Sequence, residues 1–287
     1  MMREHKFIFT QATAAMAMPL KHLWRLVFGD ASDYIDLFFA QRFVPENTMV
    51  ALFEGAPVAM LYLLPVTIRK NQTDYDARYI YAVGTHPDFR SQGCSGGLLN
   101  AAHAHLASQG VALSLLVPAE PSLFAYYGMR GFNTAFFRQT VLCTATKNGV
   151  QAALKTAELP HLSAMRDHFF GESGLYARWD TAALAYQQKE AALLGGETLA
   201  FDTPEAGYAV CYPTKDAVLI KEWAAKTIYP NVLNAIAARF GCEKIMLRLP
   251  ADFIGGRALE PFAMTKWYLS ERDAPQGKAP YLSLVLD

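Results

Sequence analysis

The sequence has no excess of charge of either sign. Lysine and arginine together number 26, and aspartate and glutamate also number 26, so the formal net charge at pH 7 is zero with histidine neutral. Only 18% of the 287 residues are charged. A protein that binds nucleic acid by neutralising phosphates normally carries a clear basic excess. We therefore expect no nucleic-acid partner.

Long apolar runs and export signals are also missing. The longest uninterrupted apolar run, Val58 to Val66, has about half the length that a helix needs to cross a bilayer. The charged start, Met1 to Lys6, is not followed by the apolar stretch and small-residue cleavage site of a signal peptide. These absences predict a cytoplasmic protein with no membrane partner.

Cysteine is scarce, and no pair of cysteines has the spacing of a metal site. The four cysteines are Cys94, Cys143, Cys211 and Cys242. They form no C-x-x-C pair, which argues against a zinc knuckle or a disulfide framework. The histidines show no convincing ligand spacing either. We expect reduced thiols and no metal site.

Apolar and aromatic residues, in contrast, are plentiful. They make up 52% and 13% of the chain, which suits well-filled cores and excludes a disordered protein. A chain of 287 residues is comfortable for two domains of about 100 to 150 residues each. The composition leaves a homo-oligomer open.

The first half is patterned as helices followed by strands. Periodic apolar residues predict helices over 19–28 and 34–43, and alternating or β-rich runs predict strands over 48–53, 57–68 and 79–85. Further along, the pattern predicts a helix over 98–107, a strand over 112–117, a short helix over 124–127 and a closing strand over 136–144. The region from 79 to 117 is therefore a strand, helix, strand crossover in an α/β (α+β) fold.

The second half resembles a diverged copy of the first. The segment that begins Leu99-Asn100-Ala101 and the segment that begins Leu233-Asn234-Ala235 share a helix, turn and strand pattern. Between strand and helix, the first copy has the long glycine-rich stretch 86–98, whereas the second has only 225–232 without glycine. Chance recurrence in an alanine-rich chain is the alternative. We expect a domain over 1–147 that carries the working site and a degenerate domain over 148–287.

The stretch Arg90 to Gly97 follows a predicted strand and precedes a predicted helix. The first amide groups of a helix have no intrahelical partner and carry a partial positive charge, so phosphate oxygens are attracted there. Gly93, Gly96 and Gly97 give them access. Neither a Walker A motif nor G-x-G-x-x-G is present, so nucleotide hydrolysis and dinucleotide binding lose support.

Two motifs here resemble those of the GNAT acetyltransferases. Thr85-His86-Pro87-Asp88-Phe89-Arg90-Ser91-Gln92-Gly93-Cys94-Ser95 is similar to the family's acyl-CoA loop, V-x-P-x-(Y/F)-R-x-x-G-x-G/A, and Tyr126-Tyr127-Gly128-Met129-Arg130-Gly131-Phe132 matches F-Y-x-x-x-G-F. Thr85 and Ser95 depart from the pattern but are small. The resemblance covers about residues 17–145. A tandem arrangement with a degenerate second copy also resembles relatives of the Eis (enhanced intracellular survival) acetyltransferases.

The resemblance implies two tandem GNAT-like domains, each a mixed, mostly antiparallel sheet flanked by helices. It also implies an N-acetyltransferase that moves the acetyl group of acetyl-CoA to a primary amine by direct attack. Tyr127 matches the general acid that protonates the departing thiolate. The coenzyme-binding residues that it implies are Val83, Gly84, Thr85, Arg90, Ser91, Gln92, Gly93, Cys94, Ser95 and Gly96.

No residue stands out as the base that accepts the amine proton. An alkylammonium of pKa about 10.4 must lose its proton at neutral pH, at a cost of about 4.6 kcal/mol. Glu120 is one candidate, and Tyr81 and His86 are others that would act through water. The resemblance adds the terminal carboxylate of Asp287 as a further candidate. The acceptor, a small-molecule or peptide amine, cannot be identified from the sequence.

Two other functions remain as alternatives. Gly93-Cys94-Ser95-Gly96-Gly97 fits G-x-S-x-G, the turn that presents the nucleophilic serine of α/β-hydrolases. That turn should follow a strand directly, but six residues, Pro87 to Gln92, intervene. The other alternative is a sensor that binds acyl-CoA without chemistry, in which Tyr127 would have no catalytic part.

Overall fold

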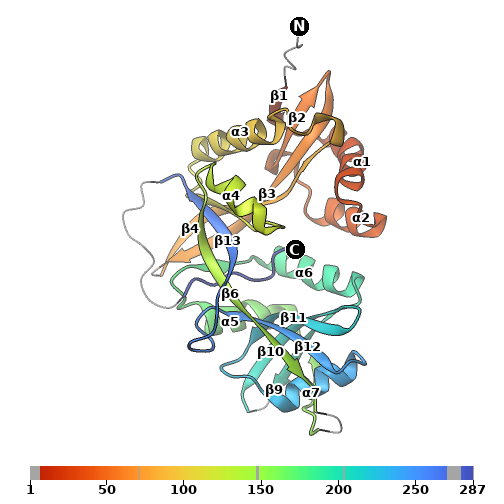
Figure 1. The fold of residues 1–287 in the computed structure, drawn as a ribbon, viewed down its shortest axis with the longest axis vertical. Helices are drawn as coiled ribbons and strands as arrows, with labels where there is room; N and C mark the ends of the chain where they lie inside the picture. Colours follow the sequence, from red (N-terminus) through yellow and green to blue (C-terminus); the bar gives the residue numbers. More distant parts are fainter. Residues whose placement is uncertain (1–6, 71, 147–148, 203, 270–278, 287) are drawn as a thin grey trace. The chain divides into compact units, whose positions relative to one another are not determined.

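The structure is a computed structural model that describes residues 7–70, 72–146, 149–202, 204–269 and 279–286 (Figure 1). The chain divides into two compact units. Unit 1 comprises the described residues of 1–66, 75–133 and 264–271, and unit 2 comprises those of 67–74, 134–263 and 272–287. Each unit therefore combines segments from both halves of the sequence. The division into sequence copies over 1–147 and 148–287 stays a prediction.

Unit 1 contains a mixed sheet with the strand order β1-β2-β3-β4-β5-β13. Its strands are β1 (Ile8–Gln11), β2 (Thr48–Phe53), β3 (Ala56–Lys70), β4 (Thr73–Thr85), β5 (Leu113–Leu116) and β13 (Glu260–Trp267). Its helices are α1 (Ala17–Phe28), α2 (Ser32–Gln41), α3 (Cys94–Ser108) and α4 (Pro121–Gly128), with 3-10 turns η1 (Ala14–Met16), η2 (Pro45–Asn47) and η3 (Pro87–Phe89). β4 and β5 are parallel, whereas β5 and β13 are antiparallel.

The core of unit 1 lies between its sheet and α3. Leu98, Leu99, Ala102 and Leu106 of α3 are buried there, at helical spacing. On another helix, α1, Leu20, Leu23 and Trp24 of the expected apolar face are buried, whereas Phe28 at its end is 42% exposed. The helix ends at Gly29, whose positive φ of 75° suits glycine. Burial of these apolar faces supplies most of the driving force for folding.

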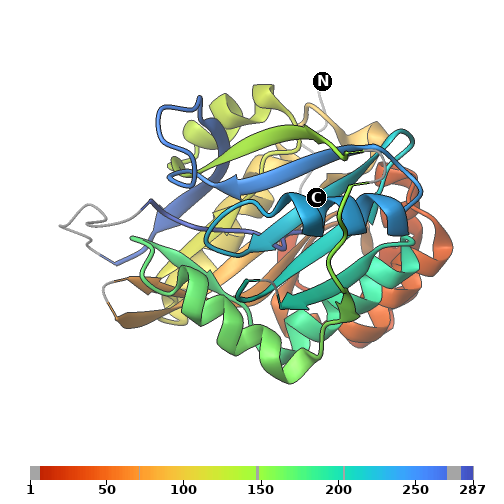
Figure 2. The ribbon, with the colours of Figure 1, turned by 90° about the horizontal axis from the view of Figure 1, so that it is seen from below.

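In unit 2 the sheet strands follow the order β6-β12-β11-β10-β9-β7. Its strands are β6 (Asn133–Thr144), β7 (Lys155–Thr156), β9 (Glu197–Asp202), β10 (Ala206–Pro213), β11 (Ala217–Ala224) and β12 (Lys244–Pro250), and β8 (Tyr176–Arg178) pairs with the end of β3. Its helices are α5 (Leu159–Phe170), α6 (Thr181–Leu193) and α7 (Pro230–Arg239). In Figure 2 the yellow-green β6 lies beside the blue β12, with which it pairs in antiparallel fashion.

The two units repeat one topology. β4 and β5 are parallel and joined through α3, and β11 and β12 are parallel and joined through α7. The closing antiparallel strand is β13 in unit 1 and β6 in unit 2. Each closing strand comes from the other half of the sequence. The expected α/β architecture, with mixed, mostly antiparallel sheets flanked by helices, is confirmed.

The start of α3 differs from the expectation. The sequence pattern predicts a helix from residue 98, but α3 begins at Cys94. Residues 94–97 are small and two of them are glycine, so their intrinsic helix propensity is low. Packing decides the local structure instead: Cys94 is buried, and a side chain at Gly97 would come within 2.3 Å of Phe9 Cζ. Strand β1, which carries Phe9, was not expected from the sequence.

Candidate functional site

The predicted coenzyme site begins where β4 and β5 separate. Their parallel pairing covers Ala77–Tyr79 and Leu113–Leu115, and β4 continues to Thr85 beyond the last paired residue. Ala82 has a positive φ of 48°, an uncommon conformation for alanine in a strand. The residues that follow, Val83 to Thr85, are those expected to pair with the pantetheine arm. Their backbone lies past the point at which β5 pairs with β4.

Gly84 is buried against the end of α1. A side-chain carbon at this position would lie 3.1 Å from both Phe28 Cζ and Val27 Cγ1. These distances are tighter than ordinary van der Waals contact. Glycine therefore lets α1 approach β4 closely at the expected pantetheine site.

Side chains and turns hold the loop after β4. The Arg90 Nε–H group donates to Thr85 O at 3.3 Å, and Gln92 Nε2 donates to Asp88 O at 2.8 Å. Ser91 and Gly93 both have positive φ, at 59° and 79°. The loop is thus turned back on itself immediately before α3, with Gly93 as the residue that precedes the helix.

The amino end of α3 presents unpaired amide groups. The first hydrogen bond of the helix runs from Gly97 N to Gly93 O at 2.9 Å, so the amides of residues 94–96 have no intrahelical acceptor. The first turn contains no acidic residue. The partial positive charge at this end of α3 is therefore not balanced by an acidic side chain of the first turn. Such a helix end favours the binding of an anion.

A cation, Arg130, also lies at this helix end. A side-chain carbon on Gly96 would be 3.3 Å from Arg130 Nη2, so the guanidinium lies over the first turn of α3. Arg130 Nη1 donates to Tyr126 O at 2.7 Å, and Arg130 Cζ lies 3.4 Å from the centroid of the Tyr126 ring. The Tyr126 hydroxyl is 2.9 Å from Ser95 Oγ. These contacts tie α4 to the start of α3.

Arg130 and Tyr126 received no functional role from the sequence, although both lie within the second motif. Their spacing of four residues could have indicated a shared role, because side chains four positions apart lie on the same face of a helix. What the sequence did not reveal is that this face meets Gly96. That contact depends on residues more than 30 positions apart.

Tyr127, the expected general acid, is on α4 and only 8% exposed. Its ring is 5.2 Å from the Tyr126 ring and 5.9 Å from that of Phe132. Burial, with a smaller contribution from Tyr126 and opposed by Arg130, raises the pKa of Tyr127 to about 12. The phenol therefore holds its proton throughout the neutral range.

The expected bases lie in different surroundings. Glu120 is exposed and immediately precedes α4, seven residues or about 10 Å of helix axis before Tyr127. Tyr81, on β4, has its hydroxyl 2.9 Å from that of Tyr34 on α2. Asp287 lies outside the described residues. Glu120 and Tyr81 thus remain distinct candidates.

His86 and Cys94 are both constrained. The backbone N–H of Asp88 donates to His86 Nδ1 at 3.2 Å, which occupies the nitrogen that would accept a proton. Burial raises the pKa of the Cys94 thiol to about 11, so this cysteine stays protonated despite its place at a helix start. Neither residue is activated in this structure.

Among the described residues, no group of three or more His, Cys, Asp or Glu side chains is arranged to hold a metal ion. No helix within the described ranges is both long and apolar enough to span a bilayer.

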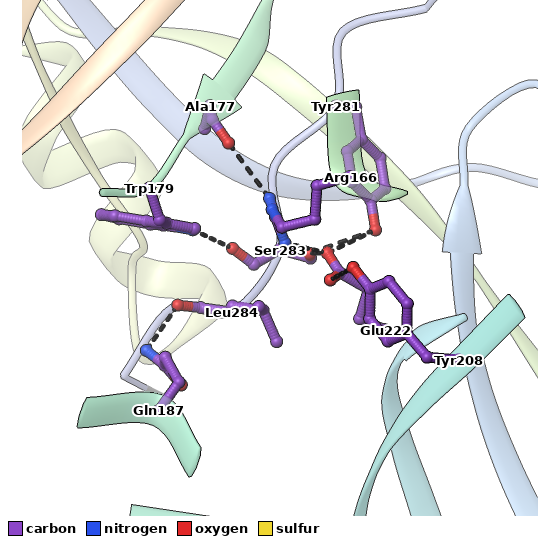
Figure 3. A network of polar contacts seen from close by, with 9 residues as sticks. All are labelled: Arg166, Ala177, Trp179, Gln187, Tyr208, Glu222, Tyr281, Ser283 and Leu284. Atoms are coloured by element: carbon purple, nitrogen blue, oxygen red, sulfur yellow. Dashed lines mark hydrogen bonds and ion pairs between the residues drawn. The ribbon is translucent and has the colours of Figure 1, made fainter. Parts of the chain in front are cut away.

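The corresponding region of unit 2 is filled by its own side chains. Glu222 on β11 accepts hydrogen bonds from Arg166, Tyr208, Tyr281 and Ser283 (Figure 3). The C-terminal segment that carries Tyr281 and Ser283 is also held through its backbone: Trp179 Nε1 donates to Ser283 O at 2.8 Å, and Gln187 Nε2 donates to Leu284 O at 2.7 Å. The start of α7 has a proline as its first residue, which removes one amide donor. These features are those of a structural core.

A comparison with protein families finds a match to residues 11–135. The matching family model is described as an acetyltransferase (GNAT) domain. No curated protein matches the chain. The resemblance drawn from the loop and the tyrosine motif is therefore confirmed for this region.

Solved structures match nearly the whole chain in fold. A GCN5-related N-acetyltransferase from Anabaena variabilis is 16% identical with a TM-score of 0.73, and the match covers 92% of this chain and 73% of that one. A GCN5-related N-acetyltransferase from Kribbella flavida is 13% identical with a TM-score of 0.63, covering 91% and 71%. Eis1 from Mycobacterium abscessus is 11% identical with a TM-score of 0.62, covering 92% and 74%. These similarities fit a tandem arrangement.

Proposed function

Since residues 11–135 belong to the acetyltransferase (GNAT) family and the protein is an acyltransferase, we propose that it transfers the acetyl group of acetyl-CoA to a primary amine. The amine attacks the thioester directly, so no acyl-enzyme forms. The acceptor is a small-molecule or peptide amine. The observation that carries the proposal is the convergence of positive groups at the start of α3.

That convergence is unfavourable unless an anion binds. The guanidinium of Arg130 lies over the first turn of α3, close to Gly96, and that turn has no acidic residue. A cation at the positive end of a helix is destabilising by the same physics that makes an anion stabilising there. A diphosphate would satisfy both groups with charge-assisted hydrogen bonds. The backbone of Val83 to Thr85 then receives the pantetheine arm.

Tyr127 acts as the general acid in this proposal. Its pKa of about 12 keeps it protonated, but it exceeds the pKa of a typical thiol by about 3.5 units. Complete proton transfer would therefore cost about 5 kcal/mol in the unliganded site. The phenol helps by donating a hydrogen bond to the sulfur as negative charge develops, with transfer completed when the acceptor's proton is released.

Glu120, Tyr81 and Asp287 remain candidate bases, and the contacts of the site favour none of them. The serine hydrolase alternative gains no support, since Ser95 Oγ is bonded to the Tyr126 hydroxyl and lies within α3 rather than on a strand-to-helix turn. The acyl-CoA sensor differs from the enzyme only in the absence of turnover. The experiment below separates them.

Calorimetry with coenzyme A and a thiol-release assay with acetyl-CoA and a panel of amines test the proposal together. We expect one coenzyme site, turnover with at least one amine, and a loss of kcat of about 100-fold or more in Tyr127→Phe. Tyr75→Phe, which removes a phenol from the opposite end of β4, is the matched control and should keep the wild-type kcat. Absence of coenzyme binding would refute the proposal, and binding without turnover would favour the sensor.

A further inference from the structure

The acetyltransferase site receives a side chain from a strand outside the matched family region. Residues Met264 to Trp267 of β13 pair with Leu116 to Leu113 of β5, in unit 1. These residues come more than 120 positions after the end of the match at residue 135. Lys266 is half-buried on this strand and extends toward the turn that follows α4.

Lys266 places a second cation, besides Arg130, at the C-terminal end of α4. Helix α4 has no basic residue in its last turn, although the carbonyl groups at a helix C-terminus carry partial negative charge. Lys266 Nζ donates to Arg130 O at 2.7 Å, two residues after the end of α4. Gly131 has a positive φ of 85°, and a side-chain carbon there would lie 3.3 Å from Lys266 Nζ. Glycine at this position thus leaves room for the ammonium group.

The same turn is bonded to the backbone of Tyr127. The amides of Arg130 and Phe132 both donate to Tyr127 O, at 2.9 Å and 3.2 Å. Lys266 therefore bonds to the Arg130 carbonyl within a turn whose amide groups donate to the Tyr127 carbonyl. Movement of this turn would displace the end of α4 on which the phenol is carried.

We propose that Lys266 is a positioning residue for Tyr127, whose ammonium group caps the C-terminal end of α4 and so fixes the phenol beside the departing sulfur. The inference rests on the proposed function, because it assigns a purpose to the placement of Tyr127. It also makes β13 a functional part of the acetyltransferase site. Tyr268, the residue after β13, also contacts α3. Its hydroxyl is bonded to His103 Nδ1 on α3 at 2.8 Å and to Ser114 Oγ on β5 at 2.7 Å.

The test compares Lys266→Met, which removes the donor and the charge, with Lys266→Arg, which keeps both. For Lys266→Met we expect kcat to fall about tenfold, because small displacements of a catalytic group have large effects on rate. The dissociation constant for acetyl-CoA should change less than kcat, because the coenzyme loop itself is not altered although Arg130 lies on the same turn. Lys266→Arg should recover most of the lost kcat. Lys244→Met, at an exposed lysine on β12, is the matched control.

A double variant separates positioning from a general loss of structure. If Lys266 acts through Tyr127, then Tyr127→Phe with Lys266→Met should be no slower than Tyr127→Phe alone, because the phenol to be positioned is already gone. A further tenfold loss in the double variant would overturn the inference. So would wild-type kcat in Lys266→Met while Tyr127→Phe is impaired. If Lys266→Met does not fold, Lys266→Gln, which keeps an N–H donor, takes its place with the same expected pattern.

The outcomes also distinguish this inference from the proposed function. Failure of the wild type to bind or turn over acetyl-CoA, or full activity of Tyr127→Phe, would refute the role of Tyr127 and the inference with it. Normal behaviour of those two proteins together with an inert Lys266 substitution would refute the inference alone.

Discussion

Ser95 Oγ and the Tyr126 hydroxyl are 2.9 Å apart, and this contact links the first turn of α3 to α4. Through it, the Tyr126 ring is fixed as a platform on which the Arg130 guanidinium stacks, 3.4 Å from the ring centroid. The guanidinium is thereby held over Gly96 at the positive end of α3. An arginine held in this place is suited to a bound diphosphate.

We predict that Arg130→Met weakens binding of coenzyme A by about 10- to 100-fold, the range expected for a lost hydrogen bond to a charged group. Binding of pantetheine, which lacks the diphosphate, should not change. Calorimetry with both ligands measures the difference directly. Arg239→Met, at an arginine of α7 in unit 2, provides the control. An equal loss for both ligands would place Arg130 in the general structure of the site rather than at the diphosphate.

The turn before α3 and the helix that carries Tyr127 could be predicted from the sequence because each depends on residues close together in the chain. Gly93 has the positive φ that its place before the helix requires, and Tyr127 lies on a helix as expected. The start of α3 could not be predicted, since small residues at 94–97 give a weak helical pattern and only the packing of Cys94 and of Gly97 against Phe9 makes them helical.

Long-range pairing accounts for most of what the sequence did not reveal. Nothing in the residues near Lys266 indicates that their strand joins β5, because the choice of neighbour in a sheet depends on the whole topology. The ion pair of Arg166 and Glu222 has the same origin: its partners are 56 positions apart and follow no periodic pattern. The expected base Asp287 lies outside the described residues, so its role stays a prediction.

Gly97→Ala should destabilise the protein by about 1 to 3 kcal/mol, as overpacking of a core typically does. The new methyl carbon would lie 2.3 Å from Phe9 Cζ, so the Phe9 ring, β1 or α3 must shift. Gly128→Ala is the matched comparison, because no atom lies within 4 Å of the new carbon and its φ is not positive. That variant should be as stable as the wild type or more stable by up to about 1 kcal/mol. Thermal unfolding of both variants measures the contrast, which equal melting temperatures would contradict.

His103 should make the protein less stable in acid. Burial lowers the pKa of His103 to about 4, and the Lys266 ammonium adds to the shift, from an ordinary value of 6.5. Because the folded pKa is below the unfolded one, the unfolded chain binds the proton more readily as the pH falls. The stabilisation is complete above pH 6.5 and is lost progressively toward pH 4, by up to about 3 kcal/mol.

Urea unfolding at about pH 7 and about pH 4.5, for the wild type and for His103→Gln, isolates this contribution. The glutamine retains polar atoms near the Tyr268 hydroxyl, which is 2.8 Å from His103 Nδ1, but it does not titrate. We expect the loss of stability between the two pH values to be smaller in His103→Gln. Since carboxylates titrate in both proteins, only the difference between them counts, and identical pH dependence would contradict the assignment.

Removing one partner of the buried ion pair of unit 2 should lower the free energy of unfolding far more than replacing both partners. Arg166 and Glu222 are 1% and 0% exposed at their side chains, so Arg166→Met leaves an uncompensated carboxylate in the core and should cost about 3 to 5 kcal/mol. In Arg166→Met with Glu222→Gln, the charge is gone, the amide oxygen can accept from Tyr281 and Ser283, which bond to Glu222 Oε2, and the amide nitrogen can donate to the Tyr208 hydroxyl, which bonds to Oε1 (Figure 3). We expect the double variant to recover about 2 kcal/mol of the loss.

Urea unfolding followed by tryptophan fluorescence is a suitable measurement, since the indole of Trp179 is bonded to Ser283 O. A double variant less stable than Arg166→Met alone would mean that the negative charge of Glu222, and not only its hydrogen bonds, is needed to hold the C-terminal segment.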